Sequence, residues 1–158
     1  MRTKKAVTSR ENERSIYIDS LNSSEKIILD FLFRWDRPIR AGDLSAELNI
    51  KHTTLNSQLQ ALENKGLIKW RRYRTISLTD TGIKLAKHLV RHHRILELLF
   101  NNLLGMTPEQ AHRESVRLFP FCSCVLINKV TKVIGNVHLC PCGYPIPESA
   151  DCEMKLTN

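Results

Sequence analysis

The chain has 158 residues, 42% of them apolar, and 24 Lys and Arg against 16 Asp and Glu, so its formal net charge is +8. This length suits one medium domain or two small ones with a real hydrophobic core. No apolar run approaches the roughly 18 residues that a membrane span requires, and the basic N-terminus lacks the apolar segment of a secretory signal. The composition excludes collagen-like, fully disordered and membrane-spanning classes, and it predicts a cytoplasmic protein.

Positive charge is concentrated in the first two thirds of the chain. Residues 65–74 hold five cations and no acid, and residues 1–14 hold five cations and two acids. Residues 100–158, by contrast, carry five charges of each sign. A cationic excess confined to one part of a chain predicts a polyanionic partner for that part, the alternative being an ordinary solvated basic surface.

The first half has the element order of a winged helix-turn-helix. In chain order, the pattern predicts helices over 22–35 and 41–48, a third from a Thr53 or Thr54 cap to Gly66, and strands over 67–71 and 75–78. The second helix of a helix-turn-helix pair lies in the major groove of DNA. We therefore expect the outward face of the third helix to meet base edges and the basic hairpin to meet phosphates.

These expectations define a set of DNA-binding residues. The set comprises Lys51, His52, Thr53, Thr54, Asn56, Ser57, Gln58, Arg71, Arg72 and Arg74. A polar outer face is typical of any solvated helix, but its combination with a basic hairpin favours double-stranded DNA as the partner.

The second half reads as helical. A helix over 80–104, ended by Gly105, carries two apolar stripes, and we expect packing on both sides and hence a homodimer. Thr107 to Gln110 form a capping box that starts the next helix, which continues to Pro120. A third helix is predicted over 125–133.

One stripe of the long helix carries chemistry. His93 and Glu97 are four residues apart, so their side chains lie one turn apart and point inward together. His112, at the start of the next helix, can complete the set. Because a buried carboxylate needs a cation, a donor or a proton, these residues could hold a divalent metal; a plain His–Glu hydrogen bond is the alternative.

Two Cys-x-Cys pairs add candidate ligands: Cys122 with Cys124, and Cys140 with Cys142. Without a secretion signal, such thiols more often bind metal or perform redox chemistry than form disulfides. Thiolates favour Zn²⁺ or an iron–sulfur cluster, whereas His and Glu also suit Mn²⁺ or Fe²⁺. The alternatives are a purely structural zinc, a thiol redox sensor, or free thiols packed as small apolar groups.

Other residues point away from catalysis. His88 and His92 lie among Lys84, Lys87, Arg91 and Arg94, so we expect them on a solvated or phosphate-facing surface, with metal binding as the alternative. The chain has no nucleophile elbow, phosphate-binding glycine loop or His-Glu-x-x-His pattern, and we predict no catalytic residues and no enzyme activity.

The order of motifs resembles the diphtheria-toxin-repressor family of metal-dependent transcriptional regulators, specifically its shorter two-domain type. The motifs are Gly42-Asp43-Leu44, TLNSQLQALENKGLI at 54–68, ISLTDTG at 76–82, RHHRILE at 91–97, AHRE at 111–114 and GYPIP at 143–147. The resemblance implies a dimer that binds operator DNA with ferrous iron or manganese as co-repressor. It also implies that His93, Glu97 and His112 occupy the family's ancillary metal site.

The family's primary metal site is not preserved. The positions that match its ligands hold Lys26, Val116, Phe119 and Pro120. The last three cannot ligate a metal through their side chains, and a protonated lysine is a poor ligand. We therefore expect a rebuilt site that uses the cysteine pairs, with Zn²⁺, an iron–sulfur cluster or redox state as the sensed species.

The sequence as a whole predicts a mainly α fold, a winged helix-turn-helix followed by an all-helical dimerisation and metal-binding domain. The expected boundaries are a basic extension over 1–21, the DNA-binding domain over 22–79, the helical domain over 80–147 and a tail over 148–158. The predicted function is a metal-dependent repressor of metal-homeostasis genes.

Overall fold

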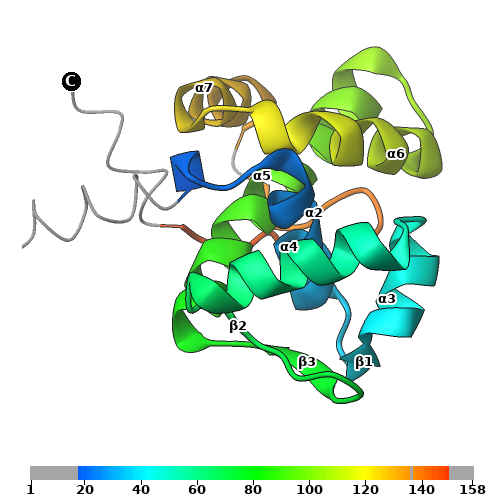
Figure 1. The fold of residues 1–158 in the computed structure, drawn as a ribbon. Helices are drawn as coiled ribbons and strands as arrows, with labels where there is room; N and C mark the ends of the chain where they lie inside the picture. The colour runs from blue at the N-terminus through cyan, green and yellow to red at the C-terminus, as the bar shows by residue number, and fades with distance from the viewer. Residues whose placement is uncertain (1–17, 136, 150–158) are drawn as a thin grey trace, which may run out of the picture. The chain divides into compact units, whose positions relative to one another are not determined.

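The computed structural model describes residues 18–135 and 137–149. It is mostly helical with one small sheet, which confirms the predicted mainly α class (Figure 1). Contacts divide the chain into two compact units: Ser24–Val90, and a second unit whose described residues are 18–23, 91–135 and 137–149. The boundary falls inside one long helix, α5 (Asp80–Leu104).

The first unit is a winged helix-turn-helix. Its elements are α2 (Ser23–Arg34), β1 (Ile39–Arg40), α3 (Ala41–Leu48), α4 (His52–Asn64), β2 (Ile68–Lys69) and β3 (Thr75–Leu78). The core is made of leucines at helical spacing: Leu44 of α3 and Leu55, Leu59 and Leu62 of α4 are fully buried. Burying one such side chain stabilises the fold by about 1.5–3 kcal/mol.

The sheet has three strands where the sequence predicted two. Its order is β1-β3-β2, with all pairs antiparallel, and Ile39 of β1 is in register with Ile76 of β3. Strand β1 has only two residues, so it is too short for an alternation of apolar and polar residues to show in the sequence. Figure 1 shows the connection between β2 and β3 as the wing of the motif.

Two glycines shape the end of this unit. Gly66 takes φ +69° directly after α4, the left-handed conformation that commonly ends a helix. At Gly82, in the first turn of α5, an added Cβ would lie 1.9 Å from the carbonyl oxygen of Leu67. The start of α5 can therefore lie against β2 only without a side chain at this position.

Local interactions differ from the sequence prediction at the start of α4. The predicted Thr53 or Thr54 cap is wrong: α4 begins at His52, and Lys51 at the N-cap makes no side-chain capping bond within the described residues. Helix α2 starts where predicted, and the carboxylate of Glu25 accepts two bonds of 2.7 and 2.8 Å from Lys65 Nζ. This partly buried ion pair joins the first turn of α2 to the end of α4.

The second unit contains the rest of α5, then α6 (Pro108–Leu118), a 3₁₀ turn η1 (Phe119–Phe121) and α7 (Cys124–Ile134). The Thr107 capping box is confirmed, since Thr107 Oγ1 accepts from Gln110 N and Gln110 Oε1 accepts from Thr107 N. Pro120 ends α6 as predicted, and Ser123 caps α7 by accepting from Leu126 N.

Most side chains of the two apolar stripes of α5 are buried. Every residue from His92 to Leu98 is buried, whereas Leu103, at the end of one stripe, is 53% exposed. Most of each stripe therefore packs within the chain itself, and the stripes alone do not establish a dimer partner. Among the helices that the structure describes, none is long and apolar enough to cross a membrane.

Candidate DNA-binding surface and metal site

Helix α4 presents the predicted base-reading residues to solvent. Lys51, His52, Thr53, Thr54 and Ser57 are exposed, and Asn56 and Gln58 are half-buried. Leu55 and Leu59, one turn apart, are buried in the core, so the opposite face of the helix points outward. Ser57 Oγ donates to the carbonyl of Thr53 at 3.1 Å, so its hydroxyl lies along the helix.

The predicted cations of the wing differ in their contacts. Arg72 and Arg74 are exposed on either side of Tyr73, which is 89% exposed with φ +64°. Arg71 instead donates to Glu63 Oε1 at 2.7 Å, and the same oxygen accepts from Trp70 N. Glu63 thus ties the base of the wing to α4 and leaves two arginines at its tip.

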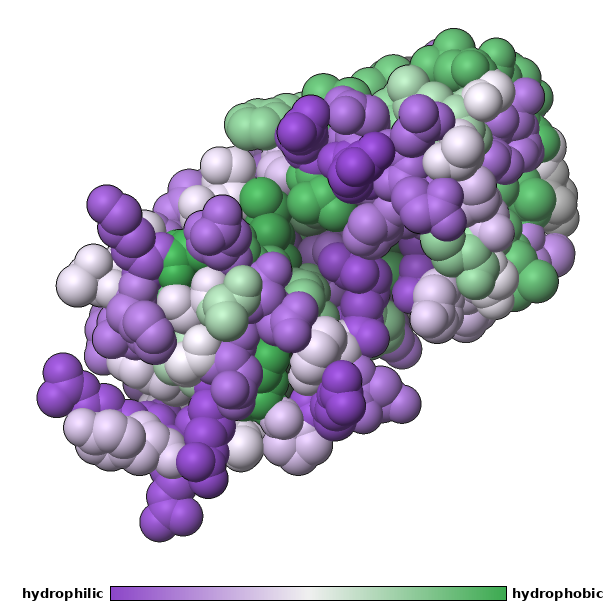
Figure 2. All heavy atoms as spheres, turned by 90° about the vertical axis from the view of Figure 1, so that its right-hand side faces the viewer, coloured by the Kyte–Doolittle hydropathy of each residue, from purple (hydrophilic) through white to green (hydrophobic). Residues whose placement is uncertain are grey.

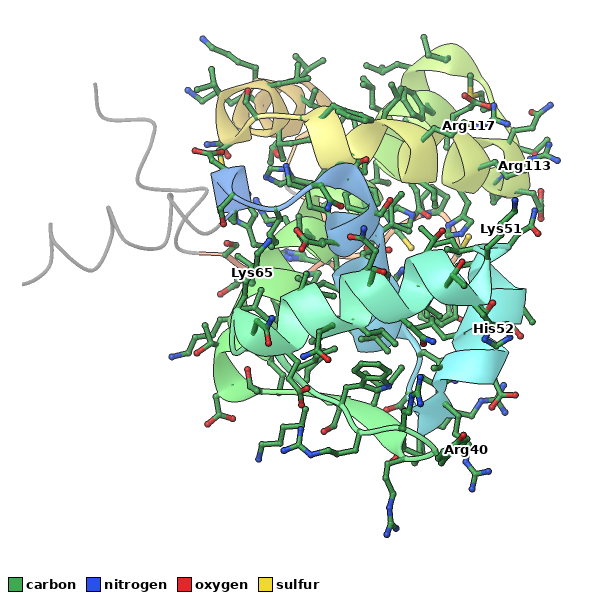
Figure 3. The ribbon with its side chains drawn as sticks, in the orientation of Figure 1. Arg40, Lys51, His52, Lys65, Arg113 and Arg117 are labelled. Atoms are coloured by element: carbon green, nitrogen blue, oxygen red, sulfur yellow. The ribbon has the colours of Figure 1, made fainter. Side chains whose placement is uncertain are left out.

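Sequence reasoning missed one cation on this face. Arg40 lies in β1, is exposed and stands in register with Thr75 of the wing strand. Figure 3 places Arg40, Lys51 and His52 along the same side of the unit. A two-residue strand gives too weak a pattern for the sequence to show that Arg40 joins the wing.

In the second unit, three predicted metal ligands converge. The three donor atoms are His93 Nε2, Glu97 Oε1 and His112 Nδ1; the carboxylate oxygen lies 3.0 Å from His93 and 2.6 Å from His112, and the two ring nitrogens are 3.2 Å apart. Donors that lie about 2.0–2.2 Å from a common metal ion are separated by roughly 3 Å. The three atoms thus resemble one face of a coordination shell.

The electrostatics of the triad also suit a cation. Burial alone would raise the pKa of Glu97, but the hydrogen bonds from His112 and His93 outweigh it and hold that pKa far below its ordinary range. The carboxylate is therefore ionised at neutral pH. One oxygen of the Glu97 carboxylate contacts both imidazoles. A divalent ion can take the place of the protons that the carboxylate and the imidazoles share.

The surroundings orient the triad and leave a way in. The buried ring of Phe119 stacks on His93, with centroids 5.4 Å apart and an interplanar angle of 10°. The His112 side chain is 39% exposed, whereas those of His93 and Glu97 are almost fully buried. An ion can thus reach the triad from the His112 side.

The second cysteine pair lies at this triad. Cys140 is buried, and it lies close enough to Glu97 for the carboxylate to affect the pKa of its thiol. Burial raises the pKa of Cys140, and the charge of Glu97 raises it further. The exposed Cys142 interacts with Cys140, and burial and the Glu97 charge raise its pKa as well.

A short loop holds Cys140 in place. Leu139 and Pro145 form an isolated antiparallel bridge, and Cys140 N donates to the carbonyl of Tyr144 at 2.9 Å. Arg94 of α5 donates to the carbonyl of Pro145, and its guanidinium lies 5.5 Å from the Tyr144 ring centroid. The turn therefore docks on the same helix that carries His93 and Glu97.

The first cysteine pair lies elsewhere. Cys122 Sγ donates to the carbonyl of Leu118 at 3.3 Å, which is a local contact at the end of α6. Cys124 belongs to a second group that could hold a metal, with His92. The seven predicted ligands do not therefore form one cluster, and no disulfide joins any two of the four described cysteines.

The predicted exposure of His88 and His92 is wrong. They are only 1% and 3% exposed. The neighbouring cations suggested a surface, but Arg94 is itself 8% exposed, and it and Arg91 donate to carbonyls of the 145–147 segment. These two arginines donate to backbone carbonyls, whereas the sequence suggested that they face solvent or phosphate.

Exposed apolar side chains gather on α6 and α7. Leu118, Phe121, Val125 and Leu126 are between 46% and 75% exposed. Figure 2 shows hydrophobic areas on the face of the molecule that it draws. Contiguous apolar surface of this kind is typical of a protein–protein interface.

Comparison with known proteins finds related transcriptional regulators. Residues 79–148 match the family model described as iron dependent repressor, metal binding and dimerisation domain. The diphtheria toxin repressor of Corynebacterium diphtheriae is 29% identical over 110 residues, which cover 70% of this chain and 48% of that protein. An HTH-type transcriptional regulator of Methanocaldococcus jannaschii is 30% identical over 94 residues, which cover 60% of this chain and 74% of that protein.

The fold is shared with solved structures. A manganese-dependent transcriptional repressor, in complex with manganese, superimposes with a TM-score of 0.74 at 26% identity. The match covers 80% of this chain and 59% of that one. The chain spans about half the length of the first curated relatives that it matches.

Proposed function

Because the chain belongs to the diphtheria-toxin-repressor family of transcriptional regulators, we propose that it is a homodimeric, operator-binding repressor controlled by a divalent metal ion. The family consists of repressors rather than enzymes, in agreement with the prediction of no enzyme activity. The observation that carries the proposal is the convergence of His93, Glu97 and His112 within 3.2 Å, in a chain that also presents an exposed helix-turn-helix face.

The exposed face of α4 is the proposed base reader. Thr54 and Ser57 offer short hydrogen-bonding groups to base edges in the major groove, and Arg72 and Arg74 at the wing tip neutralise phosphates. Arg40 joins this surface as a further phosphate contact. The predicted residues Lys51, His52, Thr53, Asn56, Gln58 and Arg71 complete it.

The metal is proposed to bind at the triad. His93, Glu97 and His112 would hold it, with Cys140 as the fourth donor and Cys142 within reach of Cys140. A set of two imidazoles, one carboxylate and one thiolate favours Fe²⁺ or Zn²⁺ over Mn²⁺, because the thiolate is soft. Two nearby thiols are fewer than the four that an iron–sulfur cluster usually takes, so a single ion is the better fit.

Metal would act on DNA binding through linkage. An ion that binds the DNA-competent state more tightly than the other state shifts the population toward it, and DNA must tighten metal binding by the same factor. Dimerisation is proposed to use the apolar surface of Leu118, Phe121, Val125 and Leu126. A twofold dimer predicts an operator with two inverted half-sites.

Selection from a randomised duplex pool tests this function. The full chain is presented with the pool in Zn²⁺, in anaerobic Fe²⁺, in Mn²⁺ and in chelator, and the bound sequences are compared. We expect an inverted repeat to emerge with Fe²⁺ or Zn²⁺ and to fade with chelator. Equal enrichment in chelator would contradict metal control, and no enrichment in any condition would contradict operator binding.

A structural zinc is the second candidate. The proximity of Cys140 to Glu97 favours it, because the loop that carries Cys140 could be held in place by the same ion. In that case the metal would resist chelators until the chain unfolds, and removal of free metal would leave operator affinity unchanged.

A further inference from the structure

A second group of candidate ligands lies on another face of α5 and belongs to neither proposed surface. His92 of α5 and Cys124 of α7 place a ring nitrogen and a sulfur within 4.8 Å of one another. Both are buried, at 3% and 9% exposure. The triad shares none of these residues.

The helix itself supplies a third donor. His88 lies four residues before His92, so the continuous helix α5 stacks the two imidazoles one turn apart on the same face. The side chain of His88 is 1% exposed, and the two rings offer nitrogens within 4.8 Å of each other. Two histidines at this helical spacing are a known arrangement for binding zinc.

The position of Cys124 favours a thiolate. It is the first residue of α7, directly after the Ser123 cap. The N-terminus of a helix carries a partial positive charge that stabilises an anion there. A cation bound by Cys124 and the two imidazoles would itself stabilise a thiolate there.

We propose that His88, His92 and Cys124 form a second, buried metal site for a thiophilic divalent ion, with Zn²⁺ as the expected occupant. Two imidazoles and one thiolate match the nitrogen and sulfur donors that Zn²⁺ takes, and they leave one position for water. Such a site would fasten the first turn of α7 to α5. It goes beyond the proposed function, which rests on the triad.

Single-thiol variants give the sharpest test. The chain has five cysteines, so one variant keeps Cys124 and replaces the other four with serine, and its matched control keeps Cys122 instead. Both variants carry four substitutions, and circular dichroism checks that both are folded. Each is titrated with Co²⁺, whose bond to a thiolate gives a charge-transfer band in the near ultraviolet.

The expected result separates the two variants. The Cys124 variant should show the band and saturate it with one equivalent of Co²⁺, whereas the Cys122 variant should show none. Adding His92→Gln to the Cys124 variant should remove the band. Absence of the band from the folded Cys124 variant, or an equal band from the Cys122 variant, would overturn the proposal.

If a four-serine variant does not fold, the zinc content of the wild type and of single-substitution variants tests the proposal. Native mass spectrometry should find two tightly held ions per chain in the wild type, one in Cys124→Ser and two in Cys122→Ser. Glu97→Gln should lose the triad ion and keep the other. A wild-type chain with one ion that survives Cys124→Ser would overturn the second site and leave the triad, and thus the proposed function, intact.

Discussion

The two units of this chain carry their chemistry in opposite ways. In Ser24–Val90, the proposed DNA-binding side chains are exposed and rest on a separate leucine core, so Thr54 and Arg72 take little part in packing. In residues 91–149, His93 and Glu97 are buried and belong to the packing themselves. The difference teaches that substitutions should separate function from stability in the first unit and couple them in the second.

Removing the carboxylate of the triad should have the largest effect. Glu97→Gln keeps the volume but removes the charge that both imidazoles face. Since even residues outside the ligand shell change metal affinity by about 10–100-fold, we expect loss of a ligand to weaken it by about 100-fold or more. Titration calorimetry with Zn²⁺, together with thermal unfolding of the metal-free chain, measures both consequences.

A matched control comes from the same unit. Glu114 lies on the surface of α6, where it accepts from Arg117 at 3.1 Å. Glu114→Gln should leave metal affinity and melting temperature unchanged. If Glu97→Gln behaved in the same way, the coupling of function and packing in this unit would be refuted.

The wing arginines should have a large effect without a stability cost. The double substitution Arg72→Ala and Arg74→Ala removes two proposed phosphate contacts, so affinity should fall for every duplex and the slope of log affinity against log salt should flatten by about 2. The melting temperature should stay the same because both side chains are exposed. Fluorescence anisotropy over a range of salt concentrations gives the slope.

The control removes the same charge from the other unit. Lys129 and Lys132 are exposed on α7, and their double alanine variant lowers the net charge equally. We expect its salt slope to match the wild type. An equal flattening in both variants would mean that total charge, rather than the wing, governs binding.

These two regions were also unequally predictable from the sequence. In the first unit, exposure follows from local rules: the spacing of Leu55, Leu59 and Leu62 sets which face of α4 is buried, and Gly66 ends the helix. Thr107 and Pro120 placed the ends of α6 in the same way. Patterns that repeat along one element therefore predicted most of the helices.

Contacts between elements could not be predicted in this way. Cys122 and Cys124 look equivalent in the sequence, yet one contacts the carbonyl of Leu118 and the other lies beside His92, because the start of α7 lies between them. His88 and His92 looked exposed because of neighbouring cations. The contact of Cys140 with Glu97 depends on a loop that docks through Arg94, which no local pattern encodes.

A smaller effect is expected at Cys140, and it tests whether this loop belongs to the metal site. Burial and Glu97 raise the pKa of the Cys140 thiol, so the thiol is protonated at neutral pH without metal. Ligation must then release its proton, and affinity should rise with pH. Cys140→Ser should weaken metal binding by about tenfold and lower the number of protons released by one.

Calorimetry in two buffers of different ionisation enthalpy counts those protons. Cys122→Ser is the control, since that thiol contacts a backbone carbonyl and lies outside the triad. Equal proton release by wild type and Cys140→Ser would remove Cys140 from the ligand set. The triad and the DNA-binding surface would be unaffected by that outcome.

The smallest effect should come from Thr54, and it separates base reading from phosphate contact within the first unit. Thr54→Ala removes one hydroxyl from the exposed face of α4, so affinity for the preferred duplex should fall by about 1 kcal/mol, roughly fivefold, while affinity for unrelated duplexes stays the same. Gln60→Ala, at an exposed position nearer the C-terminal end of the same helix, is the control. Because Arg72 and Arg74 should weaken all duplexes alike, a uniform loss for Thr54→Ala would show that α4 contributes only general affinity and that base readout lies elsewhere on the unit.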